Sequence, residues 1–324
     1  MQPETSEAVD KWLGGMAWVY GPGESGPGHS LTLSGEGILA KQFVAEYCVS
    51  QAPKLARWVF HSSRQPSIWD GGKFVLRLDD GGEEFNAIEF WVTPNVNEER
   101  EELDIFVWHP SIERLPEGTC MSALFLTLDE LLGEHGTQNW IGEIKFTGEH
   151  LENSIPITEL PEWIANLERD HGWKKFSPTE TYSNYRLKTE EYSWPRGDTV
   201  VGTSRFFDLV GDYLDAKGPC EHPFPGVGMD YVFVSVPTSF FPQGEAVNGR
   251  GVIEDEIIEA LESAAAGISL GGATGRQNCY MDFAIYDGDR SIDIIRNLLR
   301  KRNVPKQTTI RFFTIDRGKE LHRV

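Results

Sequence analysis

The chain has 324 residues and carries 30 basic against 50 acidic side chains, a net charge of −20. This acidic balance disfavours direct nucleic-acid binding, because phosphate backbones attract clustered positive charge. Hydrophobic residues make up 40% of the chain and aromatic residues 11%, which is enough for packed cores and argues against disorder. The length exceeds the roughly 100 to 200 residues of one typical domain, so we expect two domains.

No apolar run reaches the roughly 18 residues of a membrane-spanning helix, and the first residues lack the basic flank and apolar core of a secretory signal. We therefore expect a cytoplasmic protein without a membrane partner. Its cysteines form no CxxC pair and are expected to be reduced and partly buried. They are Cys48, Cys120, Cys220 and Cys279.

The excess negative charge is concentrated in the front of the chain. Residues 226–324 hold 13 acidic and 12 basic side chains, whereas the first 225 residues hold 37 and 18. A charge that served solubility alone would not need to be one-sided. The asymmetry favours a negative surface in the N-terminal part that attracts a basic partner by long-range steering.

The N-terminal part predicts a mixed α/β unit with a mainly antiparallel sheet. A loop is expected at residues 21–30 and a helix at 38–50, where Leu39 and Tyr47 share one face. Strands are expected at residues 56–60, 74–78, 85–92, 103–108 and 141–146, with a hairpin at the DDGG of residues 79–82. Helices are expected at 122–132 and 158–167, an edge strand or crossing segment at 182–194, and a helix after Ser204.

The last hundred residues alternate in one recognisable order. Strands are expected at residues 231–236, 268–270, 278–286 and 308–315, and helices at 252–266 and near 291–299. The order β-α-β-β-α-β is the split βαβ arrangement of a ferredoxin-like fold. Its two helices would cover one face of a four-stranded antiparallel sheet and leave the other free to dock a partner or the preceding domain. The sequence thus predicts an α+β protein with an acidic α+β domain (1–195), a helical connector (196–227) and a ferredoxin-like domain (228–324).

Two glycine-rich segments invite a ligand-binding interpretation. GPGESG at residues 21–26 matches the dinucleotide pattern G-x-G-x-x-G, but Pro22 and Pro27 would obstruct the helix that this pattern must open, which favours a surface loop. SLGGATGRQN at residues 269–278 reads either as a hairpin turn or as a backbone cradle for an anion. The residues of that candidate ligand site are Gly271, Gly272, Thr274, Gly275, Arg276, Tyr280 and Asp282.

Acidic runs occur at residues 79–84 and 98–104. A charge run is usually a solvated loop, and the alternative is a surface for a basic protein. Aromatic residues adjoin both runs. Their side chains are expected either to be buried on one face of a strand or to form an exposed patch that binds protein. They are Trp69, Phe90, Trp91, Phe106 and Trp108. The candidate partner-binding residues are Glu98, Glu99, Glu101, Glu102, Asp104 and Trp108.

Motifs of catalysis are missing from the sequence. The eight histidines show no HxxxH or HExxH spacing, and only Cys220 and His222 are close together. There is no GxSxG nucleophile elbow and no local cysteine signature. We predict no catalytic residues, no metal and no cofactor, although a site assembled from distant residues stays open.

Three stretches together resemble a family of uncharacterised bacterial proteins. They are APKLARW (residues 52–58), FVWHPSIERLP with LFLTLDELLGEHGTQNWIGEIKF (106–146), and GGATGRQNCYMDFAIYD (271–287). The family has no assigned activity, so the resemblance implies no catalytic residue here. It implies an association with toxin immunity, since some relatives lie near toxin systems.

The leading hypothesis is a non-enzymatic protein-binding module, of the kind that inhibits a basic toxin or nuclease through an acidic surface. One alternative is a sensor of a small molecule or anion, bound near the GGATG segment or between the domains. The other is a hydrolase whose site is dispersed along the sequence.

Overall fold

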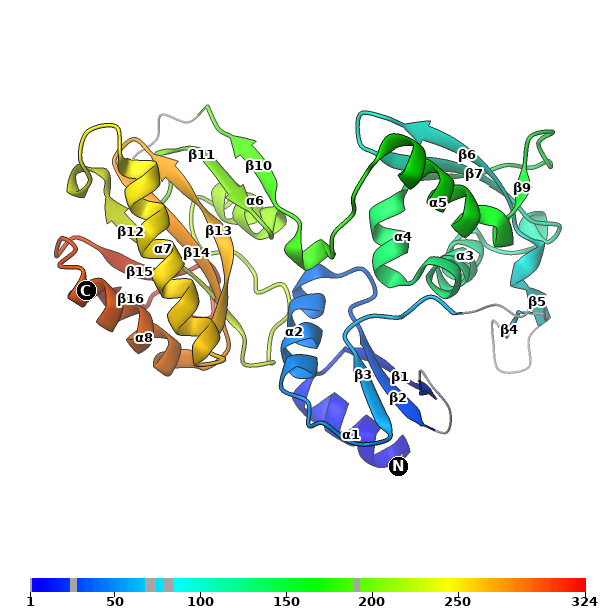
Figure 1. Cartoon of the computed structure of the whole chain (residues 1–324), viewed down its shortest axis with the longest axis horizontal. Coiled ribbons are helices and arrows are strands. Elements are labelled where there is room, and N and C mark those ends of the chain that lie inside the picture. The colour runs from blue at the N-terminus through cyan, green and yellow to red at the C-terminus, as the bar shows by residue number, and fades with distance from the viewer. Residues whose placement is uncertain (1, 24–27, 68–73, 78–83, 189–192) are drawn as a thin grey trace. The chain divides into compact units, whose positions relative to one another are not determined.

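The structure is a computed structural model that describes residues 2–23, 28–67, 74–77, 84–188 and 193–324. It contains both helices and strands, which confirms the α+β class (Figure 1). The chain forms two compact units: unit 1 comprises Met1–Gly15 with Thr179–Val324, and unit 2 comprises Met16–Pro178. The predicted boundary at residue 195 therefore differs from the observed one at residue 178. The reason is that the strands after residue 182 pair with the C-terminal sheet.

Unit 2 begins with a three-stranded sheet in the order β1-β2-β3 and one helix. Its elements are β1 (Ala17–Pro22), β2 (His29–Ser34), α2 (Leu39–Ser50) and β3 (Trp58–His61). β1 and β2 are antiparallel, whereas β2 and β3 are parallel, as a helical crossover requires. The expected loop at residues 21–30 therefore contributes its two ends to a hairpin. The hairpin runs from strand to strand, and no helix opens within the described part of the GPGESG segment.

A four-stranded sheet in the order β8-β7-β6-β9 forms the larger part of unit 2. Its strands are β6 (Trp91–Asn97), β7 (Glu102–Trp108), β8 (Ile141–Phe146) and β9 (Ile155–Pro156), and its helices are α3 (Glu117–Leu132), α4 (Glu134–Trp140) and α5 (Leu160–His171). β7 alternates strictly, with Leu103, Ile105 and Val107 buried against Leu124 and Ile164 of the helices. The intervening β7 side chains are half-buried on the other face, so the helices cover one face of this sheet.

Short elements complete unit 2. β4 (Val75–Arg77) and β5 (Glu84–Asn86) pair as an antiparallel hairpin, as expected, although the turn at residues 79–82 lies outside the described residues. Single 3-10 turns occur at Ala87–Glu89, Ile112–Arg114 and Ile157–Glu159.

Unit 1 is built on a seven-stranded sheet in the order β10-β11-β13-β14-β12-β15-β16. The strands are β10 (Ser183–Arg186), β11 (Thr199–Ser204), β12 (Asp230–Pro237), β13 (Gly267–Gly275), β14 (Asn278–Ile285), β15 (Thr309–Phe312) and β16 (Leu321–Arg323). β10 lies at one edge, as its Pro-bounded sequence indicated. α7 (Ala246–Ser263) and α8 (Gly288–Lys301) lie along one face of this sheet (Figure 1). Their apolar stripes pack on Val232, Val234 and Phe283.

The second face of this sheet is covered, which corrects the expectation that it would be free. α6 (Phe207–Asp215) places Tyr213 edge-on against Phe233 and Phe313, with ring centroids 5.4 and 5.3 Å apart. Phe206 packs on Tyr231 in the same way, at 5.6 Å. The sheet thus has buried side chains on both faces.

Three elements of unit 1 were not expected from the sequence: the helix α1 and the strands β11 and β16. α1 (Gln2–Trp12) forms in the polar N-terminus, and β16 adds a final strand. The remaining 3-10 turns are Pro178–Glu180 and Thr238–Phe240.

Candidate functional site

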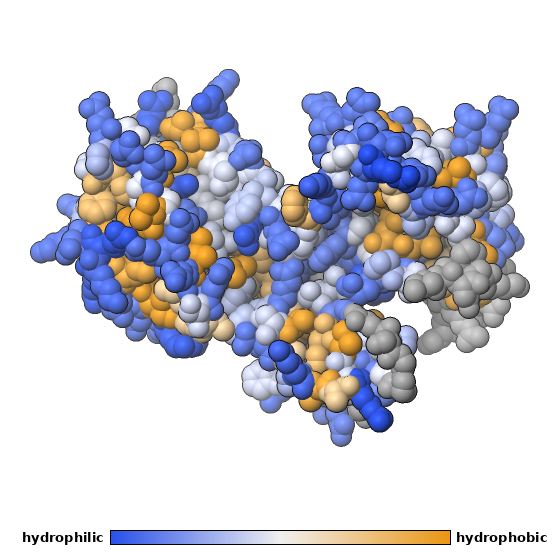
Figure 2. Space-filling view, viewed as in Figure 1, coloured by the Kyte–Doolittle hydropathy of each residue, from blue (hydrophilic) through white to orange (hydrophobic). Residues whose placement is uncertain are grey.

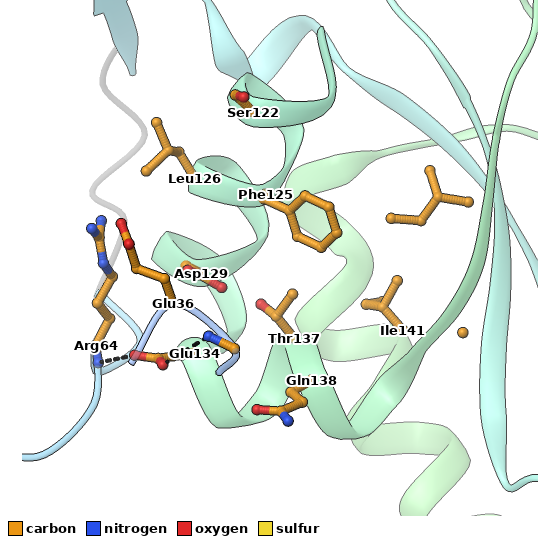
Figure 3. Close-up of a pocket in the computed structure, with 13 residues that line it drawn as sticks. Glu36, Arg64, Ser122, Phe125, Leu126, Asp129, Glu134, Thr137, Gln138 and Ile141 are labelled. Atoms are coloured by element: carbon orange, nitrogen blue, oxygen red, sulfur yellow. Dashed lines mark hydrogen bonds between the residues drawn. The ribbon is translucent and has the colours of Figure 1, made fainter. Parts of the chain in front are cut away.

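A pocket of about 580 Å³ lies in unit 2 between β8, α3, α4 and the loop after β2 (Figure 3). This volume falls within the range of small-ligand and side-chain pockets. Phe125 and Leu126 of α3 line it although they are 44% and 38% exposed, and Ile141 and Ile144 line it from β8. Figure 2 shows apolar surface in the region of α3 and α4. One wall of the pocket is therefore apolar and accessible.

Among the described residues that line the other wall are the carboxylates Glu36, Asp129 and Glu134 and the cation Arg64. Figure 3 shows Arg64, Glu36 and Glu134 toward one side of the pocket and Phe125 toward the other. An apolar wall opposite a net negative one fits a ligand that is both apolar and basic.

Glu134 holds the surroundings of this pocket together. Its carboxylate is only 2% exposed and accepts hydrogen bonds from the Ser34 hydroxyl at 2.8 Å and the Gln42 amide at 3.3 Å. It also accepts the backbone N–H groups of Gly37 at 3.2 Å and Arg64 at 3.3 Å. Because these donors come from three separate segments, Glu134 is a structural residue that fixes the acidic wall.

Asp129 is the carboxyl that a ligand can influence. Burial raises its pKa above the usual value, and the charges of Glu134 and Glu36 act in the same direction. A hydrogen bond from Thr137 and the charge of Arg64 oppose the shift. A basic group in the pocket would favour the ionised form, so binding there and ionisation of Asp129 are coupled.

The predicted partner-binding residues lie on β7 and on the turn that precedes it. Glu98, Glu99 and Glu101 are exposed at the turn between β6 and β7, and Glu102 and Asp104 are half-buried on the sheet face away from the helices. Trp108 lies at the opposite end of β7, where it contacts His150 with ring centroids 5.3 Å apart. Six residues of strand correspond to about 20 Å, so Trp108 does not join the acidic group.

The acidic group adjoins the pocket through Gly142, which lines the pocket. A Cβ at Gly142 would lie 2.6 Å from a carboxylate oxygen of Asp104 and 3.1 Å from one of Glu102. Asp104 also accepts the backbone N–H of Glu143 at 2.8 Å, which fixes it beside β8. The carboxylates of β7 and those of the pocket thus lie on either side of one strand.

The other acidic run and the remaining four aromatic residues do not support a binding surface. Asp79, Asp80, Glu83 and Trp69 lie outside the described residues, as does the side chain of Glu84. Phe90 is fully buried in the core, and Trp91 and Phe106 are half-buried.

The predicted ligand site at GGATG is a strand and not a hairpin turn. β13 runs through Gly275, and the chain turns after it at residues 276 and 277. Gly271, Gly272 and Gly275 are buried, Thr274 is half-buried and only Arg276 is exposed. These glycines serve close packing: a Cβ at Gly272 would lie 2.4 Å from the Tyr280 carbonyl oxygen.

Tyr280 and Asp282 belong to a buried polar network with residues that the sequence did not single out. Arg196 is fully buried, forms an ion pair with Asp282 and donates a hydrogen bond to the Tyr185 hydroxyl at 3.2 Å. Its guanidinium lies 4.9 Å from the centroid of the Tyr280 ring. Burial is the largest influence on the pKa of Arg196 and acts to lower it. The charge and hydrogen bond of Asp282, together with Tyr185 and Tyr280, outweigh burial, so the net shift is upward.

Asp198 completes this network. It accepts a hydrogen bond from the Tyr280 hydroxyl, and its second oxygen accepts the backbone N–H groups of Gln277 at 2.7 Å and Asn278 at 3.0 Å. The network therefore anchors the β13–β14 turn to the segment before β11. Its groups are buried and engaged with one another, which is the arrangement of a structural element and not of an open site.

The pocket carboxylates were not predicted as a site. Asp129 and Glu134 lie in the segment LDELLGEHG, where the leucines gave only a helix signal. The sequence carried no signal that Glu134 is buried, because it follows the glycine that ends the helix. Glu36 and Arg64 come from loops about 100 and 70 residues before Glu134, so no local pattern connects them.

Within the described ranges, no group of three or more His, Cys, Asp and Glu side chains could hold a metal ion. Cys220 donates to the carbonyl of Phe313, and His222 contacts the carbonyl of Met229 at 2.9 Å. The same residues contain no helix that is both long and apolar enough to cross a membrane. Comparisons with protein-family models, curated proteins and solved structures find no match for this chain.

Proposed function

We propose that unit 2 is a protein-binding module that recognises a basic partner at the acidic pocket and the adjoining carboxylates of β7. The observation that carries this proposal is the pocket that combines apolar residues of α3 and β8 with Glu36, Asp129 and Glu134. Glu102 and Asp104 add negative charge on the opposite face of the sheet, beside Gly142 of β8. Charged groups in a cleft with apolar walls concentrate the field and speed the encounter with an oppositely charged partner.

The distribution of charge supports this assignment to unit 2. Residues 16–178 contain 26 acidic and 12 basic side chains, which is −14 of the net charge of −20. A basic toxin or nuclease is the partner class that fits both this charge and the resemblance to proteins associated with toxin immunity. The role proposed for the chain is inhibition by binding, without a reaction of its own.

Unit 1 is proposed as the scaffold of the molecule, with a ferredoxin-like arrangement at its centre. The strand order β13-β14-β12-β15 with α7 and α8 on one face supports this assignment. β10, β11 and β16 extend that sheet at both edges.

The proposed function is tested by binding of the full chain to a panel of purified basic toxins and nucleases, measured at 50 and 500 mM NaCl. We expect affinity for the cognate protein to fall at least about tenfold over this range, because exposed charges are screened over a few ångströms at high salt. The charge reversal Glu36→Lys should weaken binding by a similar factor. It alters the acidic wall without touching the hydrogen bonds of Glu134.

Glu259→Lys is the matched control, because Glu259 is exposed on α7 in unit 1 and the net charge changes equally. Its affinity should equal that of the unaltered chain. Binding that is indifferent to salt, or that both reversals weaken equally, would contradict a specific acidic site in unit 2.

A further inference from the structure

The strand β8 forms an edge of its sheet, since the order is β8-β7-β6-β9. The N–H of Glu143 points toward β7, where it donates to Asp104, and the N–H of Thr147 donates to the Val107 carbonyl at 2.9 Å. Backbone groups alternate in direction along a strand, so those of Ile144 and Phe146 point away from β7. No residue that the structure describes forms a hydrogen bond with these outward groups.

A hollow accompanies this edge along its length. The acidic pocket and a second pocket of about 470 Å³ share Ile144 as a lining residue. The second pocket is bounded by Cys120 and Glu117 of α3 and by Phe146 at the far end of β8. The space beside β8 is thus bordered by α3 on one side and by unpaired strand backbone on the other.

The charges along the hollow favour a basic occupant. Of the residues that the structure describes, three carboxylates and Arg64 line the first pocket, and Glu117 lines the second. Lys145 also lines the second pocket, but its ammonium group is paired with Glu143 at 2.8 Å. A segment with Lys or Arg beside apolar residues complements this surface, whereas a second copy of the acidic edge does not.

We propose that an extended segment of a basic partner protein adds to β8 as a further strand of the sheet. Its backbone pairs with the outward groups of Ile144 and Phe146, and an apolar side chain enters the hollow beside Phe125. Lys or Arg side chains of the segment face Glu36 and Asp129. This is recognition by strand addition, in which main-chain hydrogen bonds provide affinity and pockets for alternate side chains provide specificity. The inference rests on the proposed function and specifies its geometry.

The test uses the full chain and a fluorescent library of ten-residue peptides in which apolar residues alternate with Lys or Arg. The tightest binder is then N-methylated, either at residues in one register or at the intervening residues. Only one register directs its N–H groups to β8, so one methylated peptide should lose at least about tenfold in affinity while the other binds like the parent. A side-chain pocket without strand pairing would not distinguish the two registers.

Two variants locate the site. Ile144→Pro removes an N–H that points away from the sheet, a position where an edge strand tolerates proline, and should reduce peptide affinity about tenfold. Leu126→Lys introduces a positive charge on the exposed wall of the hollow and should also reduce the affinity for the basic peptide about tenfold. Val252→Lys is the control, because Val252 is 52% exposed on α7 of unit 1. Circular dichroism verifies the fold of each variant.

Each other outcome overturns strand addition. Equal loss in both methylated registers, or full affinity of Ile144→Pro, would show a different binding mode and leave the basic partner in place. Salt-sensitive binding of a folded basic protein without binding of any peptide would also contradict strand addition and leave the basic partner in place. If the chain forms a concentration-dependent dimer that Ile144→Pro abolishes, strand β8 pairs with a second copy of the chain and not with a basic partner. Failure of the proposed function itself is recognised separately, by the absence of salt-sensitive binding to every basic protein.

Discussion

Glu254 is a carboxyl of unit 1 whose ionised form is disfavoured by burial in the folded chain. It lies on α7, it is mostly buried, and its carboxylate is 3.7 Å from the Arg250 guanidinium. Ser269 donates a hydrogen bond to it at 3.2 Å. Burial nevertheless raises its pKa to about 7, and the charge of Asp282 acts in the same direction. The folded chain therefore binds a proton at Glu254 that the unfolded chain releases at lower pH.

This pKa predicts how stability depends on pH. A carboxyl with a raised folded pKa contributes stability that is full below its unfolded pKa near 4.5 and is lost as pH rises through about 7. Glu254→Gln removes the titration, so between pH 5 and 8 its free energy of unfolding should fall less than that of the unaltered chain, by on the order of 2–3 kcal/mol. Urea unfolding at the two pH values measures the difference.

The control is Glu259→Gln, five residues further along the same helix and exposed. It should leave the pH dependence unchanged. Parallel pH profiles for the Glu254→Gln variant and the unaltered chain would contradict the assigned pKa.

At the same scale, the sequence singled out Tyr280 and Asp282 as candidate ligand residues, and the structure places both in a buried polar network. Tyr280 and Asp282 were selected because they follow a glycine-rich segment. Their partners Arg196, Asp198 and Tyr185 lie some 80 to 100 residues earlier, so only the folded sheet brings them together. A buried ion pair and an exposed ligand site use the same residue types, and burial, which decides between them, is a tertiary property.

At the scale of elements, the glycines of β13 explain why a strand was mistaken for a turn. Glycine is unfavourable inside strands on average, so GGATG reads as a break. In the structure Gly271 has φ +113°, and a Cβ there would lie 2.2 Å from the carbonyl oxygen of Thr203 on β11. The glycines permit β11 and β13 to approach closely at Gly271, beside the point where the register between β13 and β14 shifts.

Gly271→Ala is therefore expected to destabilise the chain. The positive φ and the contact with backbone together should lower the free energy of unfolding by about 2–4 kcal/mol. Gly251→Ala provides the comparison, because Gly251 lies inside α7, its φ is not positive, and a Cβ would meet nothing within 4 Å. That substitution should stabilise by about 0.5–1 kcal/mol. Chemical denaturation of both variants measures the sign of each effect. A lower free energy of unfolding in Gly251→Ala would contradict this account of the glycines.

Elements with strong local periodicity were predicted well. The helices observed as α2, α3 and α8 and the strands β7 and β8 match their expected positions within a few residues, because apolar residues recur at the period of the element. α1 was missed because its 11 residues, QPETSEAVDKW, are mostly polar. The hollow along β8 could not be predicted, since it depends on which strand lies at the edge and on which helix lies beside it.

At the scale of the whole molecule, the sequence showed the charge asymmetry but not the division of the chain. The division is discontinuous: residues 1–15 belong with residues 179–324. Contiguous boundaries are the natural assumption when only composition and turn signals are available. The observed division strengthens the charge argument, since the net charge of unit 1 is −6 with the N-terminal helix included.

The two units have cores made of different residues, and this predicts their unfolding behaviour. Leu124 is fully buried in the core of unit 2, and Leu261 is fully buried between α7 and the sheet of unit 1. Replacing either leucine by alanine costs about 3–5 kcal/mol in a well-packed core. Because each unit buries its own apolar surface, calorimetry of the full chain should show two transitions, and each variant should lower only one.

The expected decrease in the affected melting temperature is on the order of 6–20 °C for units of this size. Leu124→Ala should affect the transition of unit 2, which is also the one that the cognate basic protein raises by binding. Leu261→Ala should affect the other transition and leave binding intact. A single transition that both substitutions lower together would mean that the units unfold as one. Binding would then protect the whole chain, and stability measurements alone could not assign the partner to unit 2.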